Sequence, residues 1–547
     1  MGGKPRADDG SRSGWPFAAV IDGGWPTPAP PRTGERMDGL PSGPPDRGVT
    51  RAQPAGQHGD MTIGPAPGPA APGPDRPSGP AEPDEAGAPA AAVALPPRAE
   101  RAARADEAVD RLRTAAVEAV AVTWVDNAGI ARVKAVPLAA LAHAAQWGVG
   151  TAPCFDVFLA DDAITTSPVI GGPTGDLRLY PDLDRVVPLA AQPGWAWAPG
   201  DRYTQGGAPH PGCQRLFARR MEAAAAGRGL SLKAGIEVEW VVALAGSPQE
   251  EPRYPTHGPA YGMHRLTDLS DYLRDVLRAL GEQGLGVLQI HPEYSPGQFE
   301  VSVAPEGPVG AADTSVLVRH TIRAVSARHG LRASFAPLVE AGAVGNGGHL
   351  HLSLWRDGRN LGHGGPGPHG LTAEAEGFLA GVLDALPELL VLGCSSPAGY
   401  LRLVPSHWAG AYQCWGLENR EAALRLVTGS TGERAAAANA EVKCFDASAN
   451  PYLAVGAVIA AGLAGLDQRL ALPPEFTGDP AAAEPGTVPR LPEGPAGALA
   501  AYERSAVLRE ALGEPLYQAV LAVRRAEGEQ YAAATSEESV AATRWRY

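Results

Sequence analysis

Beyond residue 210, the apolar positions of the chain alternate between the spacing of helices and the spacing of strands. Apolar residues recur every three to four positions at 215–226, 269–280, 311–329, 371–392, 452–470 and 498–526. Shorter runs typical of strands fall at 232–244, 287–291, 299–303, 332–337, 348–355, 411–415, 422–427 and 440–445. Strands separated by long helices predict an α+β domain over residues 211–547, with a mixed sheet and helices packed outside it.

Residues 101–210 predict a smaller, strand-rich domain. The expected elements are a helix over 102–120, a hairpin over 122–136 around an Asp-Asn-Ala-Gly turn, a short helix over 138–146 and a strand near 177–180. A stretch rich in Gly and Pro follows and ends near residue 210, where we place the domain boundary.

Residues 1–100 differ from the rest in composition. They contain 38 Gly plus Pro, and the remaining 447 residues contain 84 of the total of 122. A segment of this composition without a regular repeat buries too little apolar surface to offset the entropy of ordering it. We therefore expect residues 1–100 to be disordered.

Charge and composition exclude several broad classes of protein. The 46 basic and 60 acidic residues give a net charge of −14, which argues against binding nucleic acid or an anionic membrane. The longest apolar run, 452–466, has 15 residues with three Gly, and it fits a buried helix better than a membrane span. The five cysteines form no CxxC pair, and the N-terminus lacks the apolar core of a secretory signal. We expect a cytoplasmic protein.

Acidic residues occur on strands that are otherwise apolar. They form two pairs and one single residue: Glu237 with Glu239, Glu293 with Glu300, and Glu441. His349 and His351 fall on one face of a further strand. One pair alone is compatible with a solvated strand face, and the two histidines alone with a hydrogen-bonded core pair. A buried lone carboxylate costs several kcal/mol, however, so acids on several strands together favour a cation site. Mostly oxygen ligands favour two Mg²⁺ or Mn²⁺ ions over Zn²⁺.

Arginines follow the same region of the chain. Arg402, Arg420 and Arg425 lie near the acidic strands in sequence, and an arginine fork suits phosphate and carboxylate oxygens. Surface ion pairing is the alternative for each arginine taken singly. Metal ions with convergent arginines favour phosphoryl transfer, and the chain has no GxxxxGK[ST] motif, which excludes a P-loop.

Five motifs occur in one order: GIEVE (235–239), PEYSPGQFE (292–300), GNGGHLHLSLW (345–355), NREAALR (419–425) and AEVKCFDASANPYL (440–453). Together they resemble the glutamine synthetase family, from about residue 117 to about residue 531. The resemblance implies a β-grasp-like N-terminal domain and a catalytic domain of sheet and helices. It also implies rings, usually dodecamers, with active sites between neighbouring subunits. The implied chemistry uses ATP to form γ-glutamyl phosphate from glutamate, and a nitrogen nucleophile then displaces phosphate.

The resemblance assigns a role to each motif residue. The first metal ion would be held by Glu239, Glu293 and Glu300, and the second by Glu237, His349 and Glu441. The nucleotide would contact His351, Ser353, Arg420 and Arg425, with the two arginines around the transferred phosphate. The amino-acid substrate would contact Arg402, Gly345 and Lys443. Arg402, Arg420 and Trp408 are the residues we expect to act in catalysis.

Several positions depart from the family pattern. Trp408, in the segment 404–410 (VPSHWAG), replaces the catalytic glutamate that binds ammonium and accepts its proton in true glutamine synthetases. Tryptophan is no base, but it can wall an apolar pocket or stack on a larger cation. Lys443, Leu338 and Val344 replace an arginine, a lysine and an asparagine of the family. The loop 479–489 has no tyrosine, so control by tyrosine adenylylation is not expected.

Three hypotheses follow from this pattern. The first is a ligase that joins glutamate to an organic amine, such as a polyamine, ethanolamine or a small monoamine. The second is true glutamine synthesis with another acid, Asp156 or Asp161, acting across a subunit interface. The third is a non-catalytic protein that binds metal and nucleotide and acts as a regulator. The changes at Lys443, Leu338 and Val344 also leave open an acid substrate other than glutamate.

Overall fold

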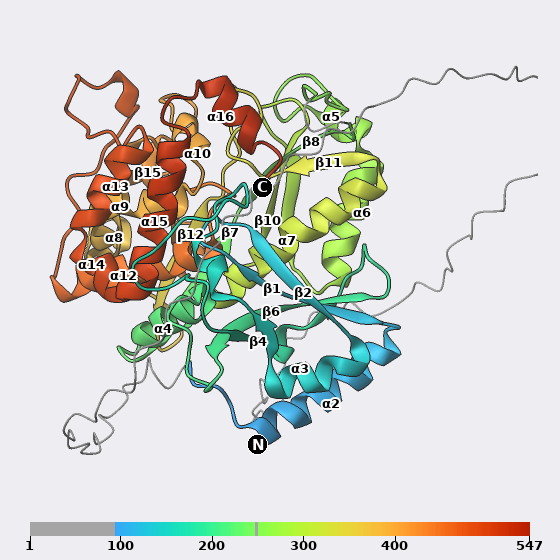
Figure 1. Ribbon diagram of the computed structural model, residues 1–547. Coiled ribbons are helices and arrows are strands. Elements are labelled where there is room, and N and C mark those ends of the chain that lie inside the picture. The colour runs from blue at the N-terminus through green and yellow to red at the C-terminus, as the bar shows by residue number, and fades with distance from the viewer. Residues whose placement is uncertain (1–92, 247–249) are drawn as a thin grey trace, which may run out of the picture. The chain divides into compact units, whose positions relative to one another are not determined.

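The described residues of the computed structural model, 93–246 and 250–547, contain three β-sheets with helices packed around them (Figure 1). Most of the segment predicted to be disordered, residues 1–92, lies outside the described residues. The end of that segment departs from the prediction, because helix α2 (Arg98–Thr114) begins within it.

The first sheet belongs to the region before residue 210 and has the strand order β2-β1-β6-β4-β3, with β5 paired to β6. Its strands are β1 (Ala119–Val125), β2 (Ala131–Pro137), β3 (Val149–Thr151), β4 (Leu177–Pro181), β5 (Val187–Pro188) and β6 (Trp195–Thr204). The predicted hairpin is confirmed as β1 and β2, whereas the helix predicted to reach residue 120 ends at Thr114. Pattern alone missed β6, which contains a Pro-Gly pair. Helices α2 and α3 (Leu141–Trp147) pack on this sheet. The assignment of this region to the β-grasp class and the domain boundary at residue 210 stay predictions.

The second sheet is antiparallel throughout and has the order β11-β8-β10-β9. Its strands are β8 (Val238–Leu244), β9 (Val287–Pro292), β10 (Gln298–Val303) and β11 (Leu331–Ser334). Helices α6 (Ser270–Glu282) and α7 (Pro308–Arg328) lie beside it, and the short α5 (Met263–Asp268) precedes them (Figure 1).

The third sheet has the order β13-β12-β16-β15-β14, with β7 paired to β12. Its strands are β7 (Ser231–Ile236), β12 (Leu350–Arg356), β13 (Arg359–Asn360), β14 (Tyr412–Leu417), β15 (Ala422–Val427) and β16 (Asn439–Val442). The single strand predicted over 232–244 is therefore two strands in two different sheets, and the chain crosses from the third sheet to the second at Glu237. The continuous apolar pattern hides this break, which is fixed by a hydrogen bond from the Glu237 N–H to the His349 carbonyl.

A buried helix, α12 (Pro451–Asp467), is central to the packing of the helices around these sheets. It accounts for the long apolar run, and the side chain of Asn450 caps its first turn by accepting from two backbone N–H groups. It contacts α4 (Gln214–Ala226), α7, α8 (Ala373–Asp384) and α9 (Leu386–Gly393). The approach to α8 requires glycine at position 381, where an added Cβ would lie 2.4 Å from the carbonyl oxygen of Ala461. In the described part of the chain, no helix has both the length and the apolar character needed to cross a membrane.

Two long predicted helices are interrupted. The segment 371–392 divides into α8 and α9 just before Pro387, which lacks the N–H that a continuous helix needs. The segment 498–526 divides into α13 (Pro495–Arg504), α14 (Ala506–Leu512) and α15 (Glu514–Gln530) at Ser505 and Gly513. The other α-helices of the described residues are α10 (Pro397–Arg402), α11 (Arg434–Ala437) and α16 (Ser536–Thr543).

Candidate active site

Strand register brings acidic residues of the second sheet together. Glu300 on β10 stands directly opposite Glu239 on β8 and opposite His291 on β9, so three neighbouring strands place one side chain each in a row. Residues opposite one another in a sheet point to the same face. Glu293 follows β9 and lies close to this row, with its Oε1 3.3 Å from His291 Nδ1.

A second row crosses the third sheet. Glu441 on β16 stands opposite His351 on β12 and opposite Arg425 on β15. His349 lies just before β12, with its Nδ1 3.1 Å from Glu237 Oε2 and 3.3 Å from Glu441 Oε1. Glu237, at the crossing between the two sheets, thus joins the second row to the first.

The two rows line one cavity of about 480 Å³, which we call the acidic cavity. All but two of the residues predicted for the site line it: Glu237, Glu239, Glu293, Glu300, Gly345, His349, Arg402, Trp408, Arg420, Arg425, Glu441 and Lys443. The other two, His351 and Ser353, line a neighbouring cavity of about 460 Å³ that shares Glu237 with the first. The wall of that second cavity includes apolar residues such as Ile236, Leu288 and Leu352.

The pKa values of the crowded carboxylates indicate whether divalent cations fit this cavity. Burial, together with the nearby charges of Glu237, Glu239 and Glu293, raises the pKa of Glu300 to about 10. Burial and the charge of Glu293 raise the pKa of Glu239 to about 7. Buried carboxylates this close together need a compensating positive charge to be ionised together. Among the described groups, the buried Nε2 of His349 also has no hydrogen-bond partner. The donor set therefore fits divalent cations.

Within residues 93–246 and 250–547, the acidic and histidine side chains that lie close enough to share one ion form two groups. In one, ligand atoms of Glu237, His351 and Glu441 all lie within 4.8 Å of one another, and in the other the same is true of His291, Glu293 and Glu300. Each group shares two members with a predicted ligand set. In the first group His351 stands in place of His349, and in the second His291 stands in place of Glu239. The predicted sets, with Glu239 and His349 as third members, stay predictions.

The three arginines have different surroundings. Arg402, at the end of α10, is buried and donates from Nη2 to the carbonyls of Lys443 and Phe445 at 3.0 and 2.8 Å. Arg425 is paired with Glu441 at 3.0 Å. Arg420 lies at the turn between β14 and β15 and has no ion-pair partner in the part of the chain that the structure describes. An unpaired guanidinium beside acidic side chains is free to bind an anionic ligand.

An aromatic wall borders the acidic cavity. The ring of Trp408 lies 4.8 Å from that of Tyr294, which lies 5.7 Å from Tyr261, and Tyr261 lies 5.3 Å from His291. The sequence predicted Trp408 but missed the other three residues of this wall, although Tyr294 and His291 lie within or beside the PEYSPGQFE motif. Tyr261 lies in a loop that carries no motif.

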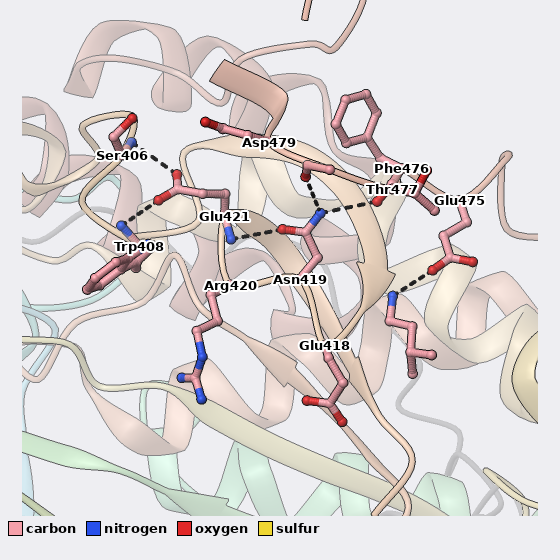
Figure 2. A pocket seen from close by; sticks show the side chains of 12 residues that line it. Ser406, Trp408, Glu418, Asn419, Arg420, Glu421, Glu475, Phe476, Thr477 and Asp479 are labelled. Carbon is pink, nitrogen blue, oxygen red and sulfur yellow. Dashed lines mark hydrogen bonds between the residues drawn. The ribbon is translucent and has the colours of Figure 1, made fainter. Parts of the chain in front are cut away.

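The loop that carries Trp408 is held by a buried glutamate that sequence reasoning also missed (Figure 2). Glu421 accepts hydrogen bonds from the Ser406 N–H at 3.2 Å and the Trp408 N–H at 2.8 Å. Ser406 and Trp408 have φ angles of 63° and 52°, a region that non-glycine residues seldom occupy. The carboxylate of Glu421, next to Arg420 in sequence, therefore fixes a strained loop beside the acidic cavity.

The residues considered as replacements for the missing catalytic acid do not line the acidic cavity. Asp156 is buried and pairs within its own chain. Its Oδ1 lies 2.6 Å from Arg202 Nη1, and its Oδ2 lies 2.6 Å from His210 Nε2. Asp161 accepts from Gln530 at 2.7 Å. Among the other departures, Lys443 and Val344 line the cavity. Leu338 is buried in a small apolar cluster instead.

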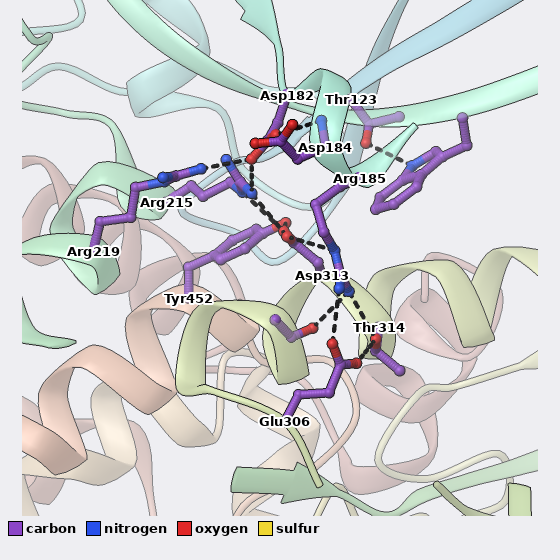
Figure 3. Close-up of polar contacts among 12 residues, drawn as sticks. Thr123, Asp182, Asp184, Arg185, Arg215, Arg219, Glu306, Asp313, Thr314 and Tyr452 are labelled. Atoms are coloured by element: carbon purple, nitrogen blue, oxygen red, sulfur yellow. Dashed lines mark hydrogen bonds and ion pairs between the residues drawn. The ribbon is translucent and has the colours of Figure 1, made fainter. Parts of the chain in front are cut away.

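A dense polar cluster outside the cavity is structural (Figure 3). Arg215 on α4 pairs with Asp182 at 2.7 Å, Asp201 at 3.0 Å and Asp313 at 2.8 Å. Asp182 and Asp201 come from the region of the first sheet, and Asp313 comes from α7. The hydroxyl of Tyr452 also donates a hydrogen bond to Asp313 at 2.8 Å. These buried pairs tie the two regions of the chain together across residue 210.

Comparisons with known proteins decide the family. The model of the glutamine synthetase catalytic domain matches residues 211–542. This chain belongs to the glutamine synthetase family. It is 57% identical over 437 residues to the gamma-glutamylpolyamine synthetase GlnA3 of Streptomyces coelicolor, across 79% of this chain and 94% of that protein. The type-1 glutamine synthetase 1 of Dictyostelium discoideum is 33% identical over 45% of this chain and 51% of its own length.

Solved structures of glutamine synthetase homologues agree with this assignment. The crystal structure of a novel glutamine synthase homolog superposes with a TM-score of 0.70 at 34% identity, over 79% of this chain and 99% of the other. A complex of GmaS with ADP superposes with a TM-score of 0.69 at 27% identity, over 78% of this chain and 96% of the other. The family fold expected from the five motifs is therefore confirmed.

Proposed function

We propose that this protein is an ATP-dependent ligase that joins the γ-carboxylate of glutamate to an organic amine, and that the amine is a polyamine. The observation that carries the proposal is Trp408, which lines the acidic cavity where true glutamine synthetases have a glutamate. The full set of acidic residues beside it supports retained phosphoryl chemistry. The similarity to a gamma-glutamylpolyamine synthetase supports the choice of amine.

The acidic cavity would hold two divalent cations, Mg²⁺ or Mn²⁺. One ion would be held by Glu239, Glu293 and Glu300, and the other by Glu237, His349 and Glu441. Oxygen-rich ligand sets favour these ions over Zn²⁺. When bound, the cations would neutralise charge on the phosphate oxygens of ATP and of the phosphorylated substrate.

The substrates would bind around these ions. The nucleotide would occupy the neighbouring cavity, whose apolar residues suit a base and sugar and whose polar residues include His351 and Ser353. Arg420 and Arg425 would hold the transferred phosphate, because guanidinium groups match phosphate oxygens in geometry and charge. Glutamate would contact Arg402, Gly345 and Lys443 on the wall of the acidic cavity.

The aromatic wall supports an organic amine over ammonium. Trp408 and Tyr294 offer two ring faces, which attract an alkylammonium group by cation–π contact and cover its methylene groups. A groove of about 540 Å³ adjoins the acidic cavity at Trp408 and Arg420, and Glu418 and Asp479 lie on its wall (Figure 2). Glu418 is paired with Arg425 at 2.6 Å, whereas Asp479 has no ion pair with any described residue, so the carboxylate of Asp479 supports a substrate with a second ammonium group.

Two alternatives make different predictions. True glutamine synthesis needs a base for ammonium, and the internal pairing of Asp156 gives it no support. A non-catalytic regulator would bind ATP without turnover for any amine. Assembly into rings, with twelve subunits and active sites shared between neighbours, is proposed from the family pattern, as is a cytoplasmic location.

Phosphate release from ATP tests the proposal. With Mg²⁺ or Mn²⁺ and glutamate, we expect release to be fastest with polyamines such as putrescine or spermidine, slower with ethanolamine or methylamine, and slowest with ammonium. Release with ammonium alone would favour true glutamine synthesis. No release with any amine would exclude ligation of glutamate and favour the regulator or a different acid substrate.

A further inference from the structure

An organic amine poses a problem of proton transfer that the proposed function leaves open. At neutral pH an alkylamine is almost entirely protonated, because its pKa lies near that of lysine, about 10.4. An alkylammonium ion has no lone pair and cannot attack γ-glutamyl phosphate. Trp408, at the position of the family's glutamate, cannot accept the proton. Some other group at the acidic cavity must therefore take it.

Most titratable groups that line the cavity are already engaged. The five glutamates and His349 are the proposed metal ligands. The three arginines cannot accept a proton, and Lys443 is ion-paired with Glu441, 3.0 Å from its Nζ. Tyr261 and Tyr294 have pKa values raised by burial and by the nearby Glu293, so both phenols stay protonated. His291 lies 3.3 Å from Glu293 and 3.6 Å from Glu300, within the acidic row.

His407 is the remaining titratable side chain on the cavity wall. Its ring forms no hydrogen bond or ion pair within the described residues, so neither ring nitrogen is committed to another group. It is half-buried and immediately precedes Trp408, the residue expected to contact the amine. Histidine is also the side chain whose unperturbed pKa, about 6.5, suits proton transfer near neutral pH.

The backbone of His407 is fixed on both sides. The two N–H groups bound by Glu421 belong to Ser406 and Trp408, the residues directly before and after it, and the loop closes at Gly410 with φ 68° (Figure 2). Glu421 is buried, and its own N–H donates to the Asn419 side chain at 3.1 Å. This arrangement holds His407 at the cavity rather than leaving it on a mobile loop.

We propose that His407 accepts the proton of the amine substrate, an inference that rests on the proposed function. The alkylammonium ion gives one proton to the free imidazole nitrogen and becomes a neutral amine. Its lone pair then attacks the γ-carbonyl carbon of γ-glutamyl phosphate, and the carbon–nitrogen bond forms as the carbon–oxygen bond to phosphate breaks. The nitrogen loses a second proton to the departing phosphate, which leaves as hydrogen phosphate. The imidazolium returns its proton to solvent.

The test compares two nucleophiles in the His407→Gln variant of the full chain. Spermidine needs a proton acceptor, whereas hydroxylamine is unprotonated at neutral pH and needs none. General-base catalysis contributes roughly 10²-fold or more, so the variant should form γ-glutamylspermidine about 100-fold more slowly than wild type at pH 7.5. Formation of γ-glutamylhydroxamate should fall by no more than a few-fold. The spermidine deficit should shrink as the pH rises toward the pKa of the amine, because more amine then arrives unprotonated.

The controls separate the possible failures. His143→Gln, which changes an exposed histidine on α3, should leave both reactions at the wild-type rate. Equal losses with spermidine and hydroxylamine in His407→Gln, or no loss with either, would overturn the role of His407 and leave the proposed function standing. Hydroxamate formation by wild type without an amide from any amine would overturn the proposed function, and this inference with it.

Discussion

Replacing Glu300 with alanine should reduce ATP-dependent turnover to near background and weaken metal binding. Glu300 is buried at the centre of the first acidic row, opposite Glu239 and His291. A bound divalent cation supplies several kcal/mol of transition-state stabilisation, so loss of this ligand should lower kcat/KM by roughly 10³-fold. Phosphate release measures the first effect, and calorimetric titration with Mn²⁺ measures the second.

The matched control for Glu300 is a glutamate outside the cavity. Glu374 on α8 pairs with Arg356 at 2.6 Å and is partly exposed, so Glu374→Ala should retain wild-type turnover and Mn²⁺ affinity. Glu300→Gln keeps the shape of the side chain and removes its titratable group. Burial and the neighbouring carboxylates raise the pKa of Glu300 to about 10, so metal-free wild type must protonate this side chain on folding near pH 7, a cost that glutamine does not carry. The metal-free Glu300→Gln protein should therefore melt at a higher temperature than metal-free wild type, and added Mn²⁺ should stabilise it less. Wild-type turnover in Glu300→Ala would refute the metal site as assigned.

Trp408→Glu should shift the preference of the enzyme from organic amines toward ammonium. The substitution removes the ring face beside Tyr294 and introduces a carboxylate at the cavity wall. Loss of a cation–π contact and of apolar cover amounts to about 1–2 kcal/mol, so the ratio of kcat/KM for spermidine to that for ammonium should fall about 5- to 30-fold. Steady-state rates with the two nucleophiles give this ratio directly.

Two variants control for the chemistry at position 408. Trp408→Phe keeps an aromatic face and should largely keep the preference for spermidine. Trp147 on α3 is 46% exposed, close to the 44% of Trp408, and lies outside the cavity. Trp147→Glu therefore makes the same change of charge at a distant site and should leave the preference unaltered. If Trp408→Glu kept its amine selectivity, Trp408 would not belong to the amine pocket.

The sequence predicted which residues gather around the acidic cavity better than how they are arranged there. Acidic residues on apolar strands can be recognised from the sequence alone, because burying an unpaired carboxylate is costly and such residues are therefore unusual there. Their assembly into two rows depends on the pairing of β8, β9 and β10 and of β12, β15 and β16, which links positions as distant as His351 and Glu441. Register between distant strands leaves no periodic signal within either strand.

The features that sequence reasoning missed depend on contacts between distant segments. The break at Glu237 divides an unbroken apolar run, and only the pairing of its two halves with different sheets reveals it. The left-handed conformation of Ser406 and Trp408 contradicts the local preference of both residues and is held by the carboxylate of Glu421. The role proposed for His407 follows only from the position of this loop beside the cavity.

The most direct test of the central claim is a competition between ammonium and spermidine. Wild-type enzyme would receive ATP, Mg²⁺, glutamate and equal concentrations of the two nucleophiles, and mass spectrometry would quantify glutamine and γ-glutamylspermidine. The aromatic wall beside an intact acidic cavity predicts γ-glutamylspermidine as the main product. Glutamine as the main product would contradict the account.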